Sequence, residues 1–219
     1  MNYDYKTLRI SIKKKIKQIE VVINLYISSK KMLKKEARSY FTNLREKMTI
    51  QEIDELSKKI HYHLISNFDF FQKRTSIFLP IQEKKEINNF LLLQKFQNTK
   101  TIFAAPVSDF KKNTLKHIVL DFKSEQIQKN KYNIPEPVYG NEILSSEFDI
   151  VLIPLMTFDK KGYRVGYGKG YYDRFLAACK NECLFIGLSL FERIDQIDDI
   201  DKYDIPLNYA ITPNKIYQF

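Results

Sequence analysis

The chain has 219 residues, of which 44% are apolar and 28% charged, and its formal net charge at pH 7 is +10. These fractions are typical of a soluble globular protein, and the length allows one sizeable core or two small ones. No apolar run approaches the roughly 20 residues of a membrane-spanning helix, so we expect no membrane partner.

Much of the positive charge lies at the N-terminus. Residues 1–31 hold eight Lys/Arg and two Asp/Glu and so carry +6 of the net +10. A nucleic-acid-binding surface needs basic residues clustered on a folded face, and the remaining residues show no such cluster, so we expect no nucleic-acid partner. Met32 opens a stretch that reads like an ordinary protein start. We therefore interpret residues 1–31 as a basic N-terminal extension, with Met32 as the true start and residues 32–219 as one domain.

Two helices are predicted first along the chain. Apolar residues recur at helical spacing from Leu33 to Met48. Thr49 and Glu52 then have the spacing of a capping box, which predicts the start of a second helix. Its buried stripe is expected at Ile53, Leu56, Ile60 and Leu64.

Short apolar runs then alternate with helical patterns. The predicted strands cover residues 75–80, 100–107, 115–122, 148–156 and 184–190, with a short last strand within 204–212. Helices are predicted at 87–96 and 171–178, and 133–140 is expected to be an extended loop because it holds two prolines. The run 148–156 is apolar on both faces and should lie centrally in a parallel sheet. The predicted fold class is α/β: a single domain, layered α/β/α, with a largely parallel central sheet.

The two cysteines, Cys179 and Cys183, are four residues apart with no histidine nearby in sequence. This spacing would make them neighbours on one helical face, but it does not supply a metal-ligand set. We interpret them as reduced, half-buried thiols of a cytoplasmic protein.

Glycine is concentrated in the stretch GYRVGYGKGYYDRF, residues 162–175. Four of the six glycines of the chain lie within nine positions here, shortly after the best predicted strand and before a helix. Successive glycines let backbone N–H groups converge on an anion, Lys169 and Arg164 add positive charge, and Asp173 could hold a cation that bridges phosphates. The spacing fits neither the P-loop nor the dinucleotide-binding fingerprint. The alternative is a glycine-rich turn whose tyrosines merely pack.

The longer string FDKKGYRVGYGKGYYDRFL resembles the signature of the 5-formyltetrahydrofolate cyclo-ligase family, also called 5,10-methenyltetrahydrofolate synthetases. Further matches follow in the family's order: KKEAR at 34–38, IFLPIQEKKEIN at 77–88, YNIPEP at 132–137 and DIPLN at 204–208. The resemblance extends from about residue 32 to the end of the chain.

The resemblance implies an enzyme that cyclises 5-formyltetrahydrofolate, with or without a polyglutamate tail, to 5,10-methenyltetrahydrofolate. ATP and Mg²⁺ would phosphorylate the formyl oxygen, N10 would attack the activated carbon, and ADP and phosphate would be released. Such a reaction needs positioning and charge neutralisation more than a side-chain nucleophile. A monomer is expected.

The resemblance also implies residue roles. Asp173 and Asp204 would bind Mg²⁺, and Lys169 and Arg164 would be catalytic. Folate would contact Leu79, Glu86, Tyr132, Pro135, Tyr167, Gly168, Lys169, Gly170 and Tyr171. ATP would contact Lys34, Lys35, Arg38, Arg164, Val165, Gly166, Tyr167, Gly168, Lys169, Gly170, Tyr171 and Tyr172.

Several positions depart from the family pattern. Glu83 is a rival to Glu86 for the pterin, because the loop before Glu86 carries extra residues. Tyr132 stands where the family often has tryptophan, Asn133 replaces a glycine, and Asn208 replaces an aspartate. Two other functions remain open from the residues alone: a nucleic-acid-binding protein, and a relative of this family that acts on a different small molecule.

Overall fold

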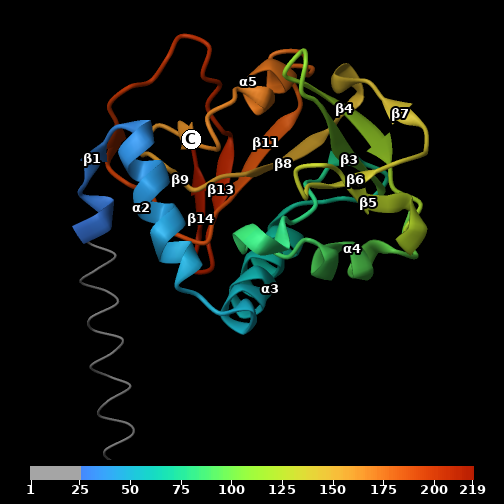
Figure 1. Cartoon of the computed structure of the whole chain (residues 1–219), viewed down its shortest axis with the longest axis horizontal. Helices are drawn as coiled ribbons and strands as arrows, with labels where there is room; N and C mark the ends of the chain where they lie inside the picture. The colour runs from blue at the N-terminus through green and yellow to red at the C-terminus, as the bar shows by residue number, and fades with distance from the viewer. Residues whose placement is uncertain (1–25) are drawn as a thin grey trace, which may run out of the picture.

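An eight-stranded sheet forms the centre of the computed structural model, which describes residues 26–219 (Figure 1). Most of the expected extension, residues 1–25, lies outside the described residues. The strand order is β14-β13-β11-β8-β2-β3-β4-β7. The strands are β2 (Arg74–Ser76), β3 (Ile102–Asp109), β4 (Thr114–Val119), β7 (Glu142–Ile143), β8 (Ile150–Pro154), β11 (Leu184–Leu188), β13 (Tyr209–Ile211) and β14 (Ile216–Gln218).

The middle of this sheet is parallel. Strands β13, β11, β8, β2 and β3 run in the same direction, and β14, β4 and β7 add antiparallel edges. The prediction of an α/β fold with a mostly parallel central sheet is confirmed.

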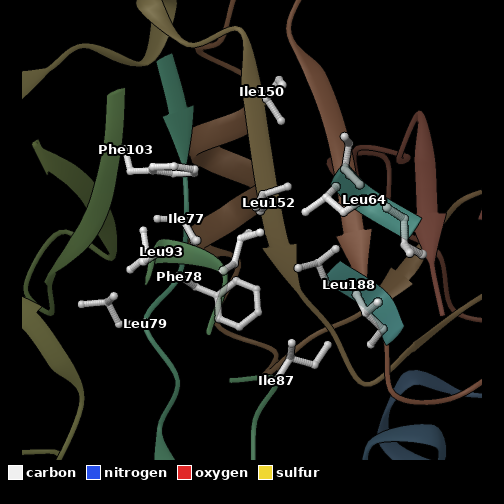
Figure 2. Close-up of a cluster of buried hydrophobic side chains, with 14 of the residues drawn as sticks. Leu64, Ile77, Phe78, Leu79, Ile87, Leu93, Phe103, Ile150, Leu152 and Leu188 are labelled. Carbon is white, nitrogen blue, oxygen red and sulfur yellow. The ribbon is translucent and has the colours of Figure 1, made fainter. Parts of the chain in front are cut away.

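Strand β8 lies between β11 and β2, as its apolar sequence predicts. Its alternate residues face two different hydrophobic clusters. Leu152 packs with Leu64 and other residues of one cluster (Figure 2), whereas Ile153 packs with Phe175 in the other. Because both faces are covered, polar residues have no place along this strand.

Within residues 31–219, the sheet is flanked by the helices α2 (Lys34–Glu46), α3 (Ile50–Asn67), α4 (Phe90–Phe96) and α5 (Tyr171–Leu176). The predicted capping box is confirmed, because the Thr49 hydroxyl accepts from the Glu52 N–H while the Glu52 carboxylate accepts from the Thr49 N–H. Of the predicted stripe, Ile53, Ile60 and Leu64 are buried and Leu56 is half-buried. Three short 3₁₀ helices complete the set: η1 (Gln82–Lys84), η2 (Ser124–Gln126) and η3 (Ser145–Glu147).

Several local predictions were wrong. The strand expected at 75–80 ends at Ser76, and Pro80 could not donate to a sheet ladder. The extended loop at 133–140 contains β6 (Pro135–Pro137), which pairs with β5 (Ile127–Lys129). The two cysteines do not share a helix, since α5 ends at Leu176; both are free thiols in the segment before β11.

The sequence pattern did not predict several strands that are only two residues long. They are β1 (Lys31–Met32), which pairs with β12 (Gln196–Ile197), and β9 (Thr157–Phe158), which pairs with β10 (Arg164–Val165). Such strands span a single two-residue period, which is too short for an alternating apolar pattern to be recognised. Within residues 26–219, no helix has the length and apolar character needed to cross a membrane.

Residues 26–31 pack against the rest of the chain. Ile27 is 5% exposed and lies in a third hydrophobic cluster with Ala37 and Phe41 of α2. Lys31 and Met32 pair with β12. The structure therefore gives these residues a packed position, while the boundary at Met32 stays a prediction.

Candidate active site

An open cleft of about 610 Å³ lies where the glycine stretch passes from β10 to α5. Besides this stretch, α2, the end of β8 and the loop at 201–204 line it. This is the carboxyl end of a central parallel strand, where α/β proteins usually bind ligands. We call this cavity the outer cleft; its volume is in the range of small-molecule sites.

Three glycines of the stretch have conformations that other residues avoid. The backbone φ is +83° at Gly162, +86° at Gly168 and +67° at Gly170. A Cβ atom at Gly168 would lie 2.8 Å from an Nη atom of Arg38, which is closer than van der Waals contact allows. Arg38 in turn donates from Nε to the Gly166 carbonyl oxygen over 2.9 Å. The glycines therefore allow a cation from α2 to lie directly against the loop.

Arg164 and Asp173 form an ion pair beside the loop. The Nη2 atom of Arg164 lies 2.6 Å from Oδ1 of Asp173, and Nη1 donates to the Ile205 carbonyl oxygen. The Ile205 N–H also donates to Asp173 Oδ1, over 3.3 Å. Burial lowers the pKa of Arg164, and the charges of Asp173 and Asp204 oppose this shift. Both predicted metal-binding carboxylates thus lie within electrostatic reach of Arg164.

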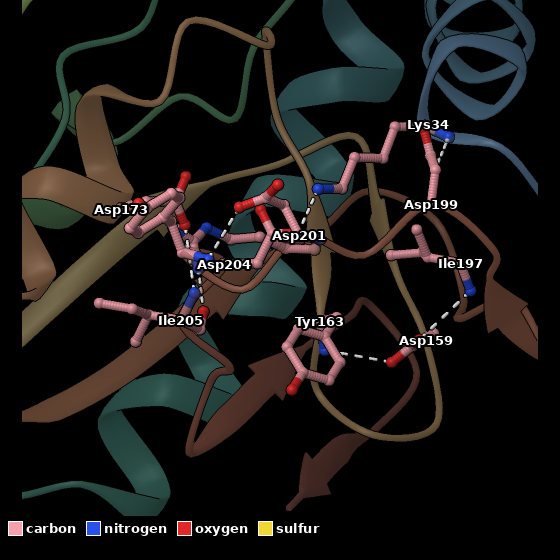
Figure 3. A network of polar contacts seen from close by, with 11 residues as sticks. Lys34, Asp159, Tyr163, Asp173, Ile197, Asp199, Asp201, Asp204 and Ile205 are labelled. Carbon is pink, nitrogen blue, oxygen red and sulfur yellow. Dashed lines mark hydrogen bonds and ion pairs between the residues drawn. The ribbon is translucent and has the colours of Figure 1, made fainter.

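Asp204 is held from two directions (Figure 3). The Lys34 ammonium of α2 forms an ion pair with its Oδ2 atom, and the Asp201 N–H donates to the same atom over 2.6 Å. The Lys34 backbone N–H donates to Asp199 over 2.6 Å, which ties the start of α2 to this acidic loop. The structure thereby brings Lys34 and Asp204 together although they are 170 residues apart.

Asp159 belongs to the sequence string that resembles the family signature, and it has a structural role. Its carboxylate accepts backbone N–H groups from Lys161, Tyr163 and Ile197, and the residue is 1% exposed (Figure 3). These bonds fix the turn between β9 and β10 against β12. They therefore hold the turn that leads into β10, which begins at Arg164.

A small cavity of about 20 Å³ adjoins the outer cleft, and we call it the inner pocket. Its wall is mainly apolar, with Phe78, Ile87, Leu155, Met156, Leu188 and Phe191 among its residues. Its polar residues include Glu86 and Arg45, which are 7% and 6% exposed. Gly166, Tyr167 and Pro154 line both cavities.

The Tyr167 hydroxyl occupies the polar end of the inner pocket. It donates to Glu86 Oε1 and accepts from an Nη atom of Arg45 over 3.1 Å, while Glu86 Oε2 accepts from the Ile81 N–H over 2.8 Å. Burial raises the pKa of Glu86, and burial followed by the charge of Glu86 raises that of Tyr167. Glu83, the rival of Glu86, is exposed and pairs with Lys129, away from either cavity.

Tyr171 and Tyr172 both line the outer cleft. Their hydroxyl groups are buried and have no hydrogen-bond partner among the described residues. Burial raises the pKa of the Tyr172 hydroxyl, so it stays protonated and can donate. Buried unpaired donors are rare, which marks these hydroxyls as groups that a ligand could satisfy.

Tyr132 stands at the rim of the site. Its ring lies 4.4 Å from that of Phe110, and the Lys169 ammonium lies 5.9 Å from its centroid. Asn133 has a φ of +59°, the conformation expected where the family has glycine. Pro135 is buried in β6 behind this rim.

Some predicted site residues lie elsewhere. Leu79 is buried in the core cluster of Figure 2, and Lys35 is exposed on α2; neither lines the two cavities. The Val165 side chain packs in the third hydrophobic cluster. Asn208 accepts from the Phe185 N–H at β11 and does not line the outer cleft.

Comparisons with known proteins identify the family of this chain. The family model described as the 5-formyltetrahydrofolate cyclo-ligase family matches residues 29–213. The chain belongs to the 5-formyltetrahydrofolate cyclo-ligase family. A 5-formyltetrahydrofolate cyclo-ligase from Mus musculus is 31% identical, over 84% of this chain and 93% of the relative. One from Haemophilus influenzae is 26% identical, over 80% and 94%.

A solved structure has the same fold. The 5,10-methenyltetrahydrofolate synthetase of Aquifex aeolicus superposes with a TM-score of 0.68 at 25% identity, covering 85% of this chain and 93% of that one. Membership of the cyclo-ligase family makes the chain an enzyme of this ligase type.

Arg45 is a residue of the candidate site that was missed from the sequence. Arg45 lies seven residues after Arg38, which is about two helical turns, so both arginines share one face of α2. That spacing could have indicated Arg45. Its hydrogen bond to Tyr167, which in turn donates to Glu86, depends on how α2 packs on the glycine stretch, and that is visible only in the structure.

Proposed function

We propose that this chain catalyses the ATP- and Mg²⁺-dependent cyclisation of 5-formyltetrahydrofolate to 5,10-methenyltetrahydrofolate, with release of ADP and phosphate. The observation that carries the proposal is the joining of two chemically different cavities. The outer cleft is lined by Lys34, Arg38 and Arg164, as an oligophosphate requires, and the inner pocket is apolar with a buried carboxylate.

The nucleotide would lie in the outer cleft. Arg38 and Lys169 would neutralise its phosphates, and the N–H groups around Gly168 and Gly170 would donate to them. The unpaired hydroxyls of Tyr171 and Tyr172 support a polar ligand at this place. Lys35 would contribute only long-range charge from its exposed position.

Asp173 and Asp204 would hold Mg²⁺ when the nucleotide is bound. No group of three His, Cys, Asp or Glu residues within residues 26–219 could form a metal site by itself. Mg²⁺ fits nonetheless, because it is usually held by one or two carboxylates together with substrate phosphates and water. The ion would supply charge neutralisation at the transferred phosphoryl group. Lys34 and Arg164, which neutralise the two carboxylates here, would then be available to the phosphates.

Reduced folate would lie between the two cavities. Glu86 would accept from the donor-rich edge of the pterin, and Tyr132 would stack near the rim, where Lys169 could also contact a polyglutamate tail. Glu86 is favoured over Glu83 because Glu86 alone lines the inner pocket. Pro135 would support the rim from behind, and Leu79 would act only through the core.

The reaction would use these groups in two steps. The formyl oxygen attacks the γ-phosphorus, an O–P bond forms, and the bond to the ADP oxygen breaks. N10 then attacks the formyl carbon, the C–O bond breaks with release of phosphate, and N10 loses its proton to solvent or a nearby base. Arg164 and Lys169 would stabilise the charge on the transferred phosphoryl group, which is where phosphoryl transfer gains most.

A spectrophotometric assay tests the proposal. Purified protein should convert 5-formyltetrahydrofolate to the methenyl product only with both ATP and Mg²⁺, and ADP and phosphate should appear in equal amounts. Turnover without nucleotide, or none under any condition, would contradict it. A monomeric state, a cytoplasmic location, and a single layered α/β/α domain over 32–219 are proposed with it.

A further inference from the structure

Tyr167 separates the two cavities of the site. Tyr167 lines both the outer cleft, of about 610 Å³, and the inner pocket, of about 20 Å³. The inner volume has room for about one water molecule, whereas pockets for small organic ligands are usually larger by a factor of ten or more. A bicyclic pterin therefore cannot contact Glu86 from inside this pocket unless the tyrosine moves.

Each carboxylate oxygen of Glu86 already accepts one hydrogen bond from the protein. Oε1 accepts from the Tyr167 hydroxyl, and Oε2 accepts from the Ile81 N–H. The Tyr167 hydroxyl thus makes the hydrogen bond that a donor of the pterin edge would make. Arg45 donates to the same hydroxyl, so the tyrosine is held at both of its hydrogen-bonding positions.

The surroundings of Tyr167 allow its side chain to leave. It stands between Gly166 and Gly168, and a Cβ atom at Gly166 would meet nothing within 4 Å. The backbone at Gly166 stays tied to Arg38, and Tyr167 already borders the larger outer cleft, so this cleft offers free volume for its side chain to enter. Lys84 and Arg45 lie 4.2 and 5.9 Å from the ring centroid, so a movement of the ring would break these cation–π contacts and the hydrogen bond from Arg45, but no salt bridge.

We propose that Tyr167 determines access to the inner pocket. In the free protein its hydroxyl occupies the hydrogen-bonding position on Glu86 that the donor edge of the reduced pterin takes. When folate binds, the tyrosine side chain moves into the outer cleft. This inference rests on the function proposed above. It also gives a specificity rule. A ligand opens the inner pocket only if it offers Glu86 a donor at least as good as the tyrosine hydroxyl.

The energetics follow from competition. A hydrogen bond that must break before the ligand binds reduces the apparent affinity, in the same way as a binding-competent state that is only partly populated. One net hydrogen bond is worth about 0.5–1.5 kcal/mol, so its removal should tighten folate binding roughly threefold to tenfold. Arg45 is a positioning residue here, since it holds the hydroxyl toward Glu86.

The test compares Tyr167→Phe with wild type by calorimetry and steady-state kinetics. We expect the Kd and KM for 5-formyltetrahydrofolate to fall by roughly threefold to tenfold. The Kd of p-aminobenzoylglutamate, which lacks the pterin edge, should stay unchanged. Tyr62→Phe is the matched control, because Tyr62 is 68% exposed on α3 and lines neither cavity.

A pH profile separates this role from a merely structural one. Glu86 is faced by Arg45 of α2, Lys84 of η1, Tyr167, and Tyr172 of α5. Loss of the Tyr167 donor should raise the pKa of Glu86 further. The KM for folate should increase as the pH falls and Glu86 becomes protonated, and in Tyr167→Phe this increase should begin at a higher pH than in wild type. Tyr167→Ala, with its fold checked by circular dichroism, should show the same shift.

The outcomes are distinguishable. If wild type does not cyclise 5-formyltetrahydrofolate, the proposed function and this inference both fall. If wild type is active but Tyr167→Phe binds folate equally or more weakly, with an unshifted pH profile, only the inference about Tyr167 is overturned.

Discussion

Arg164 and Asp173 form an ion pair in which Nη2 lies 2.6 Å from Oδ1 while the arginine side chain is only 7% exposed. The guanidinium also donates to the Ile205 carbonyl oxygen, on the segment that follows Asp204. The pair therefore joins the glycine stretch, α5 and the acidic loop, so one contact supports both the fold of the site and its charge.

Asp173→Asn should remove both functions of this pair. It leaves a buried guanidinium without its counter-charge, which typically costs about 3 kcal/mol, although the 26% exposure of the Asp173 side chain reduces that value. It also removes a proposed Mg²⁺ ligand, so turnover should fall at least about 100-fold. Urea unfolding and the cyclisation assay measure the two effects.

The matched control is Glu55→Gln. Its partner Lys58 lies 3.0 Å away, but both side chains are well exposed, so the free energy of unfolding should change by less than about 0.5 kcal/mol. Equal stability losses in the two variants would show that burial of the Arg164 pair has no energetic importance. Unchanged turnover in Asp173→Asn would refute its assignment to the site.

Gly168→Ala tests the contact between the loop and α2. The new Cβ would lie 2.8 Å from an Nη atom of Arg38, at a φ of +86°. The backbone strain should lower the free energy of unfolding by about 1–2 kcal/mol. Displacement of Arg38 should raise the KM for ATP more than that for folate.

Gly166→Ala serves as the comparison for stability. A Cβ atom there meets nothing within 4 Å, and the φ of this residue is not positive, so its free energy of unfolding should stay close to that of wild type. Similar destabilisation at both positions would mean that neither the positive φ of Gly168 nor its closeness to Arg38 is decisive.

Two buried histidines predict a loss of stability in mild acid. Burial lowers the pKa of His61 from 6.5 to about 4 and that of His117 from 6.5 to about 3. Because the unfolded chain binds these protons more tightly, the stabilisation is complete above pH 6.5 and decreases as pH falls toward the folded values. Each histidine should contribute a slope of roughly 1.4 kcal/mol per pH unit.

The hydrogen bonds of His61 identify a variant that isolates this effect. The Asn89 side-chain NH₂ donates to the Phe78 carbonyl oxygen, so Asn89 Oδ1 faces His61 and Nε2 carries the proton. His61→Gln keeps a neutral donor and should flatten the dependence of unfolding free energy on pH between 6.5 and about 4. The raised pKa of Glu86 has the opposite effect on the pH dependence of the unfolding free energy. The same pH dependence is therefore measured for Glu86→Gln. A slope equal to that of wild type in His61→Gln would contradict the assignment.

Strong local patterns were enough to predict the central elements. The run 148–156 is apolar on both faces, and it became the middle strand β8; Thr49 and Glu52 formed the expected cap. The motif likewise located the glycine stretch, because its conformation depends on residues that are adjacent in sequence. Strands such as β1 and β12 were not predictable, since two-residue pairings depend on distant partners and not on a local period.

The same distinction applies to the site. Lys34 and Asp204, or Tyr167 and Glu86, are brought together by packing, and no spacing in the sequence indicates those contacts. Glu83 and Glu86 looked equivalent in sequence. Only the position of η1 shows that one is exposed and the other lines the inner pocket.

Ile27→Ala tests whether residues before Met32 belong to the folded unit. The side chain is 5% exposed and packs with Ala37 and Phe41, so truncation should cost about 2–4 kcal/mol of unfolding free energy. A chain that begins at residue 32 should lose at least as much, because it also lacks Lys31 of the β1–β12 pair. A chain that begins at residue 26 keeps both contacts and is the matched control. If the chains beginning at 26 and 32 unfold at the same urea concentration, residues 26–31 are a dispensable extension and the domain begins at Met32.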